Sequence, residues 1–298
     1  MKRFLTQLFV YGFLILIILN GISILVFKIH QNSKLYKPSF ISNTVNNQKY
    51  DYVLLGSSMG LTSIDTKLVN NINSSSGLNA SMDDTSLGTH YLMFQHFLAS
   101  GGHADKVFVV INPSDIANEN PKESTNDYRF LPYVHRNYVN EHFKEKLGFK
   151  HYLSLSYWQP FIGVSYYNLE MVASSVQALF QPERRNRFDE EGNYSYPISG
   201  NHPNNQLSEL TLEWENPYLD KIEKLAKDNN VELIYYQPPI YNLKVINIDQ
   251  TKHLINHANK LQDPTLFYDK IHVNALGREK ITKIFAKEID IHIIKDES

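Results

Sequence analysis

The stretch at residues 52–60, YVLLGSSMG, constrains the fold of this chain more than any other feature. Four apolar residues run directly into a turn with a glycine at each end, which is the pattern of a buried strand that stops abruptly. Apolar residues at roughly helical spacing follow, at 61–71. The pattern predicts a strand, a tight turn bent at its glycines, and a helix, with Ser57 and Ser58 at the turn.

Two serines in such a turn allow two interpretations. A hydroxyl beside a helix N-terminus is well placed for a nucleophile, because backbone N–H groups there stabilise an oxyanion. The same residues also fit an ordinary turn whose serine caps the helix. A second motif favours the nucleophile, because Asp269 and His272 lie three residues apart before the last helical pattern. Such a pair supplies the base that a serine needs and the carboxylate that orients this base.

Gly-x-Ser after the first strand, together with Asp-x-x-His before the last helix, resembles the SGNH hydrolase superfamily. The Asn-x-x-Gly-Arg motif at 274–278 is similar to the membrane-anchored acyltransferase branch, which includes the teichoic-acid D-alanine transfer proteins and the alginate-type O-acetylation proteins. The resemblance extends over roughly residues 48–292. It implies Ser58 as the nucleophile, His272 as the base and Asp269 as the residue that orients the base. Ser57 stands where many members have Asp, and the transferase branch often has Ser there.

The resemblance also implies an oxyanion hole. The backbone N–H of Ser58 is one expected donor, and a second would come from the loop at 79–84. In these proteins a side-chain amide comes from an Asn in a Gly-x-Asn-Asp block after a central strand. Asn112 is the nearest match, although the glycine of the block is missing, and Asn79 is the alternative. Each asparagine is equally compatible with a structural role in a turn.

Strand-like and helix-like segments alternate along most of the chain. Strands are expected at 52–55, 106–111, 231–236 and 265–268, and helices at 88–99, 217–228, 248–261 and 274–289. This alternation predicts an α/β fold with a mainly parallel sheet, and the resemblance implies a three-layer α/β/α sandwich of the flavodoxin-like kind. Ser58, Asn112, Gln237 and Asp269 each follow an expected strand, so they should lie near one edge of the sheet.

Residues 8–27 form an uncharged apolar stretch that is long enough to cross a bilayer. The stretch exceeds the apolar core of a signal peptide, and no small-residue cleavage site follows, so we expect an uncleaved anchor at 1–29. A polar stalk is expected at 30–47, followed by one domain at 48–298. An insertion at about 118–205 would be a substrate lid or additional packing. Positive charges balance on the two sides of the apolar stretch, so the extracytoplasmic location of the domain rests on the resemblance.

Composition and motifs narrow the function further. The formal net charge of −2 gives no electrostatic case for a nucleic-acid partner. The chain contains no cysteine, which excludes disulfides, a thiolate nucleophile and cysteine-ligated metal. It also contains no HExxH motif, phosphate loop or dinucleotide fingerprint, so neither a metal nor a cofactor is expected.

Three hypotheses follow. The first is a membrane-anchored acyltransferase that carries an acetyl or D-alanyl group as an ester of Ser58 and transfers it to a hydroxyl of an extracellular polysaccharide or teichoic-acid-like polymer. The resemblance implies a membrane-bound O-acyltransferase as the partner that supplies the acyl group. The second is a tethered esterase or lipase that hydrolyses acyl esters. The third is a non-catalytic assembly factor with the same fold.

Overall fold

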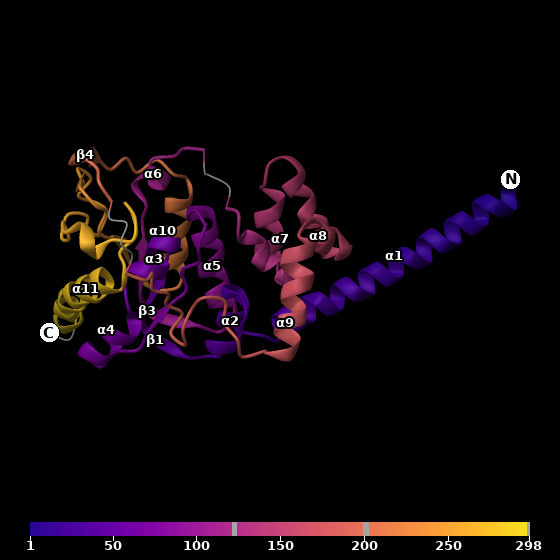
Figure 1. Cartoon of the computed structure of the whole chain (residues 1–298), viewed down its shortest axis with the longest axis horizontal. Helices are drawn as coiled ribbons and strands as arrows, with labels where there is room; N and C mark the ends of the chain where they lie inside the picture. The colour runs from indigo at the N-terminus through magenta and orange to yellow at the C-terminus, as the bar shows by residue number, and fades with distance from the viewer. Residues whose placement is uncertain (121–123, 199–202, 297–298) are drawn as a thin grey trace. The chain divides into compact units, whose positions relative to one another are not determined.

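The computed structural model describes residues 1–120, 124–198 and 203–296, and the chain divides into two compact units. The first unit comprises Met1–Thr44 and Asp127–Asn186, and the second comprises Val45–Asn126 and Arg187–Ser298. The central sheet belongs to the second unit (Figure 1).

The second unit is built on five parallel strands in the order β2-β1-β3-β5-β7. Their bounds are β1 (Lys49–Leu55), β2 (Gly77–Asn79), β3 (His103–Val110), β5 (Glu232–Gln237) and β7 (Leu254–Asn256). In the register of the sheet, Leu54 pairs with Asn79 on one side and with Phe108 on the other. A separate parallel pair joins β4 (Ser208–Thr211) to β6 (Leu243–Ile246). The predicted α/β class with a mainly parallel sheet is confirmed.

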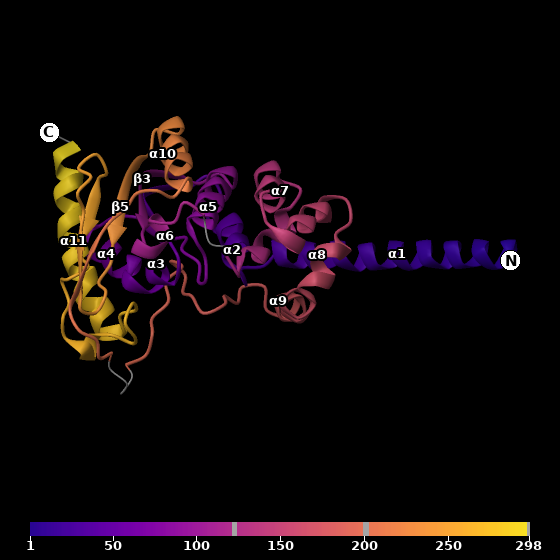
Figure 2. The same cartoon turned by 90° about the horizontal axis from the view of Figure 1, so that it is seen from above.

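Helices of the second unit pack on this sheet. They are α3 (Ser58–Ser63), α4 (Thr66–Asn73), α5 (Leu87–Ala99), α6 (Pro113–Ile116), α10 (Tyr218–Asp228), η4 (Pro264–Leu266) and α11 (Ala275–Asp296). The ring of Phe285 in α11 contacts Phe108 of β3 and Tyr236 of β5, with ring centroids 5.1 and 4.9 Å apart. Figure 2 shows α4 and α11 on one side of β3 and β5, and α5 and α10 on the other.

Three expected elements differ from the structure. The helix expected at 61–71 is divided into α3 and α4, because the Asp65 carboxylate accepts a hydrogen bond from Leu68 N and begins a new helix. Residues 248–261, all of them described, form β7 and turns in place of a helix. Side chains there bond to nearby backbone groups, as Asp249 does to Thr251 N, and so compete with helix formation. The strand expected at 265–268 is replaced by η4.

The first unit consists of helices. They are α1 (Lys2–Gln31), α2 (Lys37–Thr44), η1 (Asp127–Tyr133), α7 (Asn137–Lys144), η2 (Gly148–Tyr157), α8 (Phe161–Tyr166), η3 (Leu169–Ala173) and α9 (Ser174–Phe180). The helix α1 is long and apolar enough to cross a membrane.

The expected bounds of the stalk and of the insertion differ from those in the structure. Residues 30–47 are not a polar stalk, since α1 continues to Gln31 and α2 buries Phe40 and Ile41. This segment is mainly polar, so its few apolar side chains did not indicate the short helix that buries them. Of the expected insertion at 118–205, only residues 127–186 belong to the first unit. The residues on either side of them belong to the unit with the sheet.

Candidate active site

The turn after β1 places Ser58 as the first residue of α3. Ser57 occupies the N-cap position with an extended backbone, but its hydroxyl makes no capping hydrogen bond among the described residues. The capped-turn interpretation therefore does not describe this turn. The first intrahelical hydrogen bond runs from Leu61 N to Ser57 O, so the Ser58 N–H has no acceptor within its own helix.

The two glycines of the turn serve close packing. Neither has a positive φ, so the turn does not need glycine for a left-handed backbone. A Cβ at Gly56 would lie 2.8 Å from Val110 Cβ, and a Cβ at Gly60 would lie 2.5 Å from Ser81 Oγ. Their lack of a side chain lets the junction of β1 and α3 lie directly against β3 and the loop after β2.

Strand order places this turn at a switch point of the sheet. From β1 the chain moves outward to β2, and it then crosses β1 to form β3. In open α/β sheets, ligands bind outside the carboxyl ends of the strands where the order reverses in this way. Ser58 follows β1 and Asn112 follows β3, so both lie at this point. Gln237, at the end of β5, is fully buried and bonds to Pro238 O.

Asp269 and His272 reach Ser58 from the other end of the sequence. The His272 Nε2 lies 2.8 Å from Ser58 Oγ, and the His272 Nδ1 lies 2.8 Å from Asp269 Oδ2. An ionised carboxylate can only accept hydrogen bonds, so Nδ1 carries the proton and Nε2 accepts from the Ser58 hydroxyl. The structure thus brings the three expected residues into one hydrogen-bonded chain.

The Asp269 carboxylate is held in its ionised form. Partial burial alone would raise its pKa, but the hydrogen bond and charge of His272 oppose this effect, as do the N–H groups of Ile271 and His272. These N–H groups donate to Asp269 Oδ1 at 2.9 Å each. The pKa of Asp269 therefore lies below its ordinary value.

This lowered pKa sets a pH dependence of stability. A carboxyl group with a lower pKa in the folded chain stabilises the fold above its unfolded pKa, and this contribution is lost as the pH falls through the folded pKa. We expect the difference in Tm between the native chain and Asp269→Asn to be constant above about pH 5 and to shrink below about pH 4. Thermal denaturation across this pH range measures the difference. A difference that grows toward low pH would contradict the lowered pKa.

The structure separates the two candidate asparagines. Asn112 caps α6, and its Oδ1 accepts from Ser114 N and Oγ at 3.1 and 3.0 Å. Both bonds use the oxygen, so the amide Nδ2 is the group that can donate to a ligand. Asn112 also lines a cavity of about 260 Å³ together with Ser57. Asn79 is fully buried, and its Nδ2 donates to Gly60 O at 3.0 Å and to Asn193 Oδ1 at 3.3 Å.

Backbone donors from the loop at 79–84 are largely engaged. The Ser81 N–H donates to Asn79 Oδ1 at 3.0 Å, and the Met82 N–H donates to Gly56 O at 2.9 Å. Asp84 is the loop residue that lines the cavity beside Ser57. A second backbone donor from this loop would therefore come from its far end.

Residues 189–196, which fall within the expected insertion at about 118–205, connect the parts of the site. The Glu191 O accepts from Asn79 N at 2.8 Å, and Tyr194 N donates to Leu61 O in α3 at 3.0 Å. The Tyr196 O then accepts from Ala275 N at 3.0 Å, at the start of α11. This segment links the helix that begins with Ser58 to the helix that follows His272.

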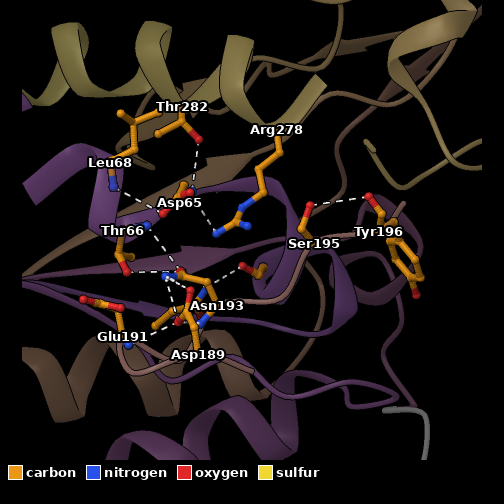
Figure 3. Close-up of polar contacts among 12 residues, drawn as sticks. Asp65, Thr66, Leu68, Asp189, Glu191, Asn193, Ser195, Tyr196, Arg278 and Thr282 are labelled. Atoms are coloured by element: carbon orange, nitrogen blue, oxygen red, sulfur yellow. Dashed lines mark hydrogen bonds and ion pairs between the residues drawn. The ribbon is translucent and has the colours of Figure 1, made fainter. Parts of the chain in front are cut away.

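Asn193 lies at the centre of these contacts (Figure 3). Its Oδ1 accepts from Thr66 N and Oγ1 at 3.2 and 3.1 Å, and its N–H donates to Asp189 Oδ1 at 2.7 Å. Gly192 between them has φ +86°, which favours glycine. The Asp-x-x-Gly-Asn pattern at 189–193 is a turn signature and is the signal that could have predicted an ordered segment here.

Tyr196 forms one wall of the site. Its ring stacks on Tyr268 with centroids 4.3 Å apart, and its centroid lies 5.1 Å from that of His272. Burial raises the pKa of Tyr196, and the charge of Asp269 adds to this effect, so the phenol stays neutral beside the imidazole. No motif in the sequence indicates a role for this residue.

The Asn-x-x-Gly-Arg motif has a structural role beside His272. The Asn274 Oδ1 accepts from Leu276 N and Gly277 N at 3.0 and 3.1 Å, which satisfies two donors of the first turn of α11. The guanidinium of Arg278 lies 3.3 Å from Asp65 Oδ2, as Figure 3 shows. The motif therefore fixes the start of α11 against α4, immediately after the loop that carries His272.

Gly277→Ala is expected to destabilise the chain. An alanine normally improves a helix by about 1 kcal/mol relative to glycine. Here, however, the added Cβ would lie 2.1 Å from Leu266 O, so the backbone of η4 or α11 must move. We expect a net loss of about 1–3 kcal/mol, as for other overpacked sites. Leu276→Ala at the half-exposed neighbouring position is the control for chemical denaturation, and equal stability of the two variants would contradict this packing argument.

Among the described residues, no three His, Cys, Asp or Glu side chains form a group that could hold a metal ion. Comparison of the chain with protein-family models and with curated proteins gave no match.

Proposed function

We propose that this chain is a membrane-anchored acyltransferase of the SGNH type. Ser58 accepts a small acyl group, acetyl or D-alanyl, and passes it to a hydroxyl of an extracellular polysaccharide or teichoic-acid-like polymer. The observation that carries the proposal is the hydrogen-bonded chain from Asp269 through His272 to Ser58. This arrangement is the one by which a serine hydroxyl is activated for acyl transfer.

In the first half of the reaction, Ser58 Oγ attacks the carbonyl carbon of the acyl donor while His272 Nε2 takes the hydroxyl proton. Asp269 stabilises the imidazolium that forms. When the tetrahedral intermediate collapses, the leaving group receives this proton from Nε2, and the acyl group remains as an ester of Ser58.

In the second half, an acceptor hydroxyl attacks the same ester. It gives its proton to His272 Nε2, and the proton returns to Ser58 Oγ as the acylated product leaves. The same steps with water as the acceptor would hydrolyse the ester. The choice between transferase and esterase therefore depends on which acceptor enters the site.

Two amide groups are the proposed donors to the oxyanion. The Ser58 N–H is unengaged within α3, and Asn112 Nδ2 lies at the adjoining strand end. Donors placed where negative charge develops lower the barrier of the reaction, because they need no reorganisation during it.

The cavity lined by Asn112 and by Ser57, the residue before the proposed nucleophile, supports a small acyl group. Its volume is about 260 Å³, and its lining includes Asp84, Asp115 and His90. Burial lowers the pKa of His90 to about 3, so this imidazole is neutral. A lining with two carboxyl groups disfavours a long alkyl chain, which argues for a short acyl group and against a lipase.

Architecture and location complete the proposal. Helices on both sides of β3 and β5 support a three-layer α/β/α sandwich of the SGNH kind. The helix α1 supports an uncleaved, single-pass anchor. We place the domain with the sheet on the extracytoplasmic side, where a membrane-bound O-acyltransferase would supply the acyl group, as the resemblance to anchored acyltransferases implies.

A serine-directed fluorophosphonate tests the proposed nucleophile. The reagent should modify the native chain on the peptide that contains Ser58, and the modification should be lost in Ser58→Ala. Ser57→Ala is the matched control and should be modified normally, because only Ser58 is bonded to His272. Modification that persists in Ser58→Ala, or that moves to Ser57, would contradict the assignment.

A further inference from the structure

The first unit has an apolar surface that the proposed chemistry does not use. Its segment at 169–180 carries one charged residue, the exposed Glu170, and no charged residue occurs from Met171 to Phe180. Met171 and Ala178 are buried within the unit. The exposed apolar side chains are Leu169, Val172, Val176, Leu179 and Phe180. A surface helix in water normally has a polar outer face, whereas a helix that is apolar all round is buried in protein or in a membrane.

The elements before this helix also carry exposed apolar side chains. The exposed large apolar side chains of η2 and its flanks are Leu147, Phe149, Tyr152, Leu155 and Trp158. Leu147, Phe149 and Trp158 are 77–79% exposed. A cavity of about 490 Å³, lined mostly by apolar residues of η2 and α8, opens among them. Large apolar surfaces are rare on soluble monomers and mark contacts with a partner or a membrane.

The helix α1 is fixed against these elements (Figures 1 and 2). The Asn20 Nδ2 donates to Gln159 Oε1 at 2.7 Å, and Asn20 Oδ1 accepts from Phe161 N at 3.3 Å. Further along, Phe27 is buried and His30 Nε2 bonds to Met171 O at 3.0 Å. Residues 20–30 of α1 therefore pack on α8, η3 and α9.

The position of these elements along α1 indicates that membrane lipid covers the apolar surface. The uncharged stretch at 8–27 is about 30 Å long as a helix, which equals one hydrocarbon core. Within its last third, Ile22, Ile24 and Leu25 remain 44–58% exposed. If this stretch lies in a bilayer, α8 beside Asn20 lies at the depth of the hydrocarbon core, and η3 beside His30 lies at its boundary. Their exposed apolar side chains then face acyl chains and not water.

We propose that η2, α8, η3 and α9 are embedded in the leaflet from which α1 emerges, and that with α1 they form a membrane platform. Lipid acyl chains cover the outer face of the uncharged segment at 171–180. The rings of Trp158, Tyr152 and Tyr166 suit the headgroup level, where amphipathic aromatic side chains concentrate. This proposal rests on α1 spanning a membrane and is independent of the Ser58 chemistry.

Spin labels on the full chain can measure the depth of this surface. The chain contains no cysteine, so each single-cysteine variant takes one label. Leu179→Cys and Val176→Cys report the proposed embedded face, and Ile15→Cys reports α1. Glu141→Cys, on the exposed surface of α7 in the same unit, is the aqueous control. Each labelled chain is placed in nanodiscs of phosphatidylcholine and phosphatidylglycerol, and collisions with oxygen and with a water-soluble nickel chelate are compared.

Labels at positions 179, 176 and 15 should collide frequently with oxygen and rarely with nickel, and the label at 141 should show the reverse. If position 15 lies in lipid but positions 176 and 179 are open to nickel, the platform is wrong and the single-helix anchor stands. If 176 and 179 are closed to both reagents, a protein surface covers this face and the proposal is also wrong. If position 15 is itself open to nickel, the anchor fails together with the platform. None of these outcomes bears on the reaction at Ser58.

Discussion

Replacing Ser58 or His272 by alanine is expected to lower turnover of an acyl ester by about 10⁶-fold, and replacing both should add little. The hydroxyl and the imidazole act as one unit, because Ser58 Oγ is 2.8 Å from the nitrogen that removes its proton. Without either group, the attack on the ester carbonyl has no activated nucleophile. The measurement is kcat/KM for a chromogenic acetyl ester with the full chain in detergent.

Asp269→Ala should cost less, about 10⁴-fold, because Asp269 orients His272 and stabilises its charged form without transferring the proton. Ser57→Ala is the matched control in the same turn and should retain most activity, since its hydroxyl is not bonded to His272. Additive losses in the Ser58 and His272 double variant would show that the two residues do not act together. Comparable activity of Ser58→Ala and the native chain would leave the assembly-factor hypothesis in place.

Asn112→Ala is expected to lower kcat by about 10²–10³-fold with little change in KM. Its amide Nδ2 is proposed to donate to the oxyanion, which exists only in the transition state, so its removal should slow the chemistry more than binding. Asn112 is partly exposed at the cavity, and the bonds of its oxygen to Ser114 are local. Stability should therefore change little, which thermal denaturation of the same sample verifies.

Asn79→Ala is the informative comparison, because it separates an oxyanion donor from a structural amide. Asn79 is fully buried and bonds to Gly60, Ser81 and Asn193, so its loss should leave buried polar groups unsatisfied and cost about 1–3 kcal/mol of stability. We expect a lowered Tm as its main effect. The opposite result would be a lower kcat but an unchanged Tm in Asn79→Ala, together with a nearly native kcat in Asn112→Ala. In that case Asn79 is the oxyanion donor and Asn112 is the structural amide.

Local patterns in the sequence predicted the core of the second unit. The apolar run at 52–55 and the β-branched run at 106–111 are buried parallel strands, since burial on both faces requires continuous apolar residues. The Asp-x-x-His spacing placed Asp269 and His272 within reach of each other. That His272 meets Ser58 depends on contacts between residues far apart in the chain, and it was expected only from the resemblance and from the positions of Ser58 and Asp269 after expected strands.

Other features could not be predicted from local patterns. Residues 248–261 have a helical period, yet side-chain bonds to the backbone and pairing of β7 with β5 determine their structure. The segment at 189–196 has few apolar residues, so no hydrophobic pattern indicates that it is ordered. Polar side chains such as Asn193 hold it in place through hydrogen bonds. The first unit assembles two distant parts of the chain, and no periodicity within either part indicates its partner.

Capture of the acyl-enzyme tests the central claim most directly. The full chain in detergent is mixed with a chromogenic acetyl ester, quenched with acid within the first turnover and examined by intact-mass and peptide analysis. The proposal predicts one acetyl group on the peptide that contains Ser58, with none on Ser58→Ala and normal acetylation of Ser57→Ala. An ester hydrolysed at full rate by Ser58→Ala, or an acetyl group that is found only on another residue, would contradict a Ser58 ester as the intermediate.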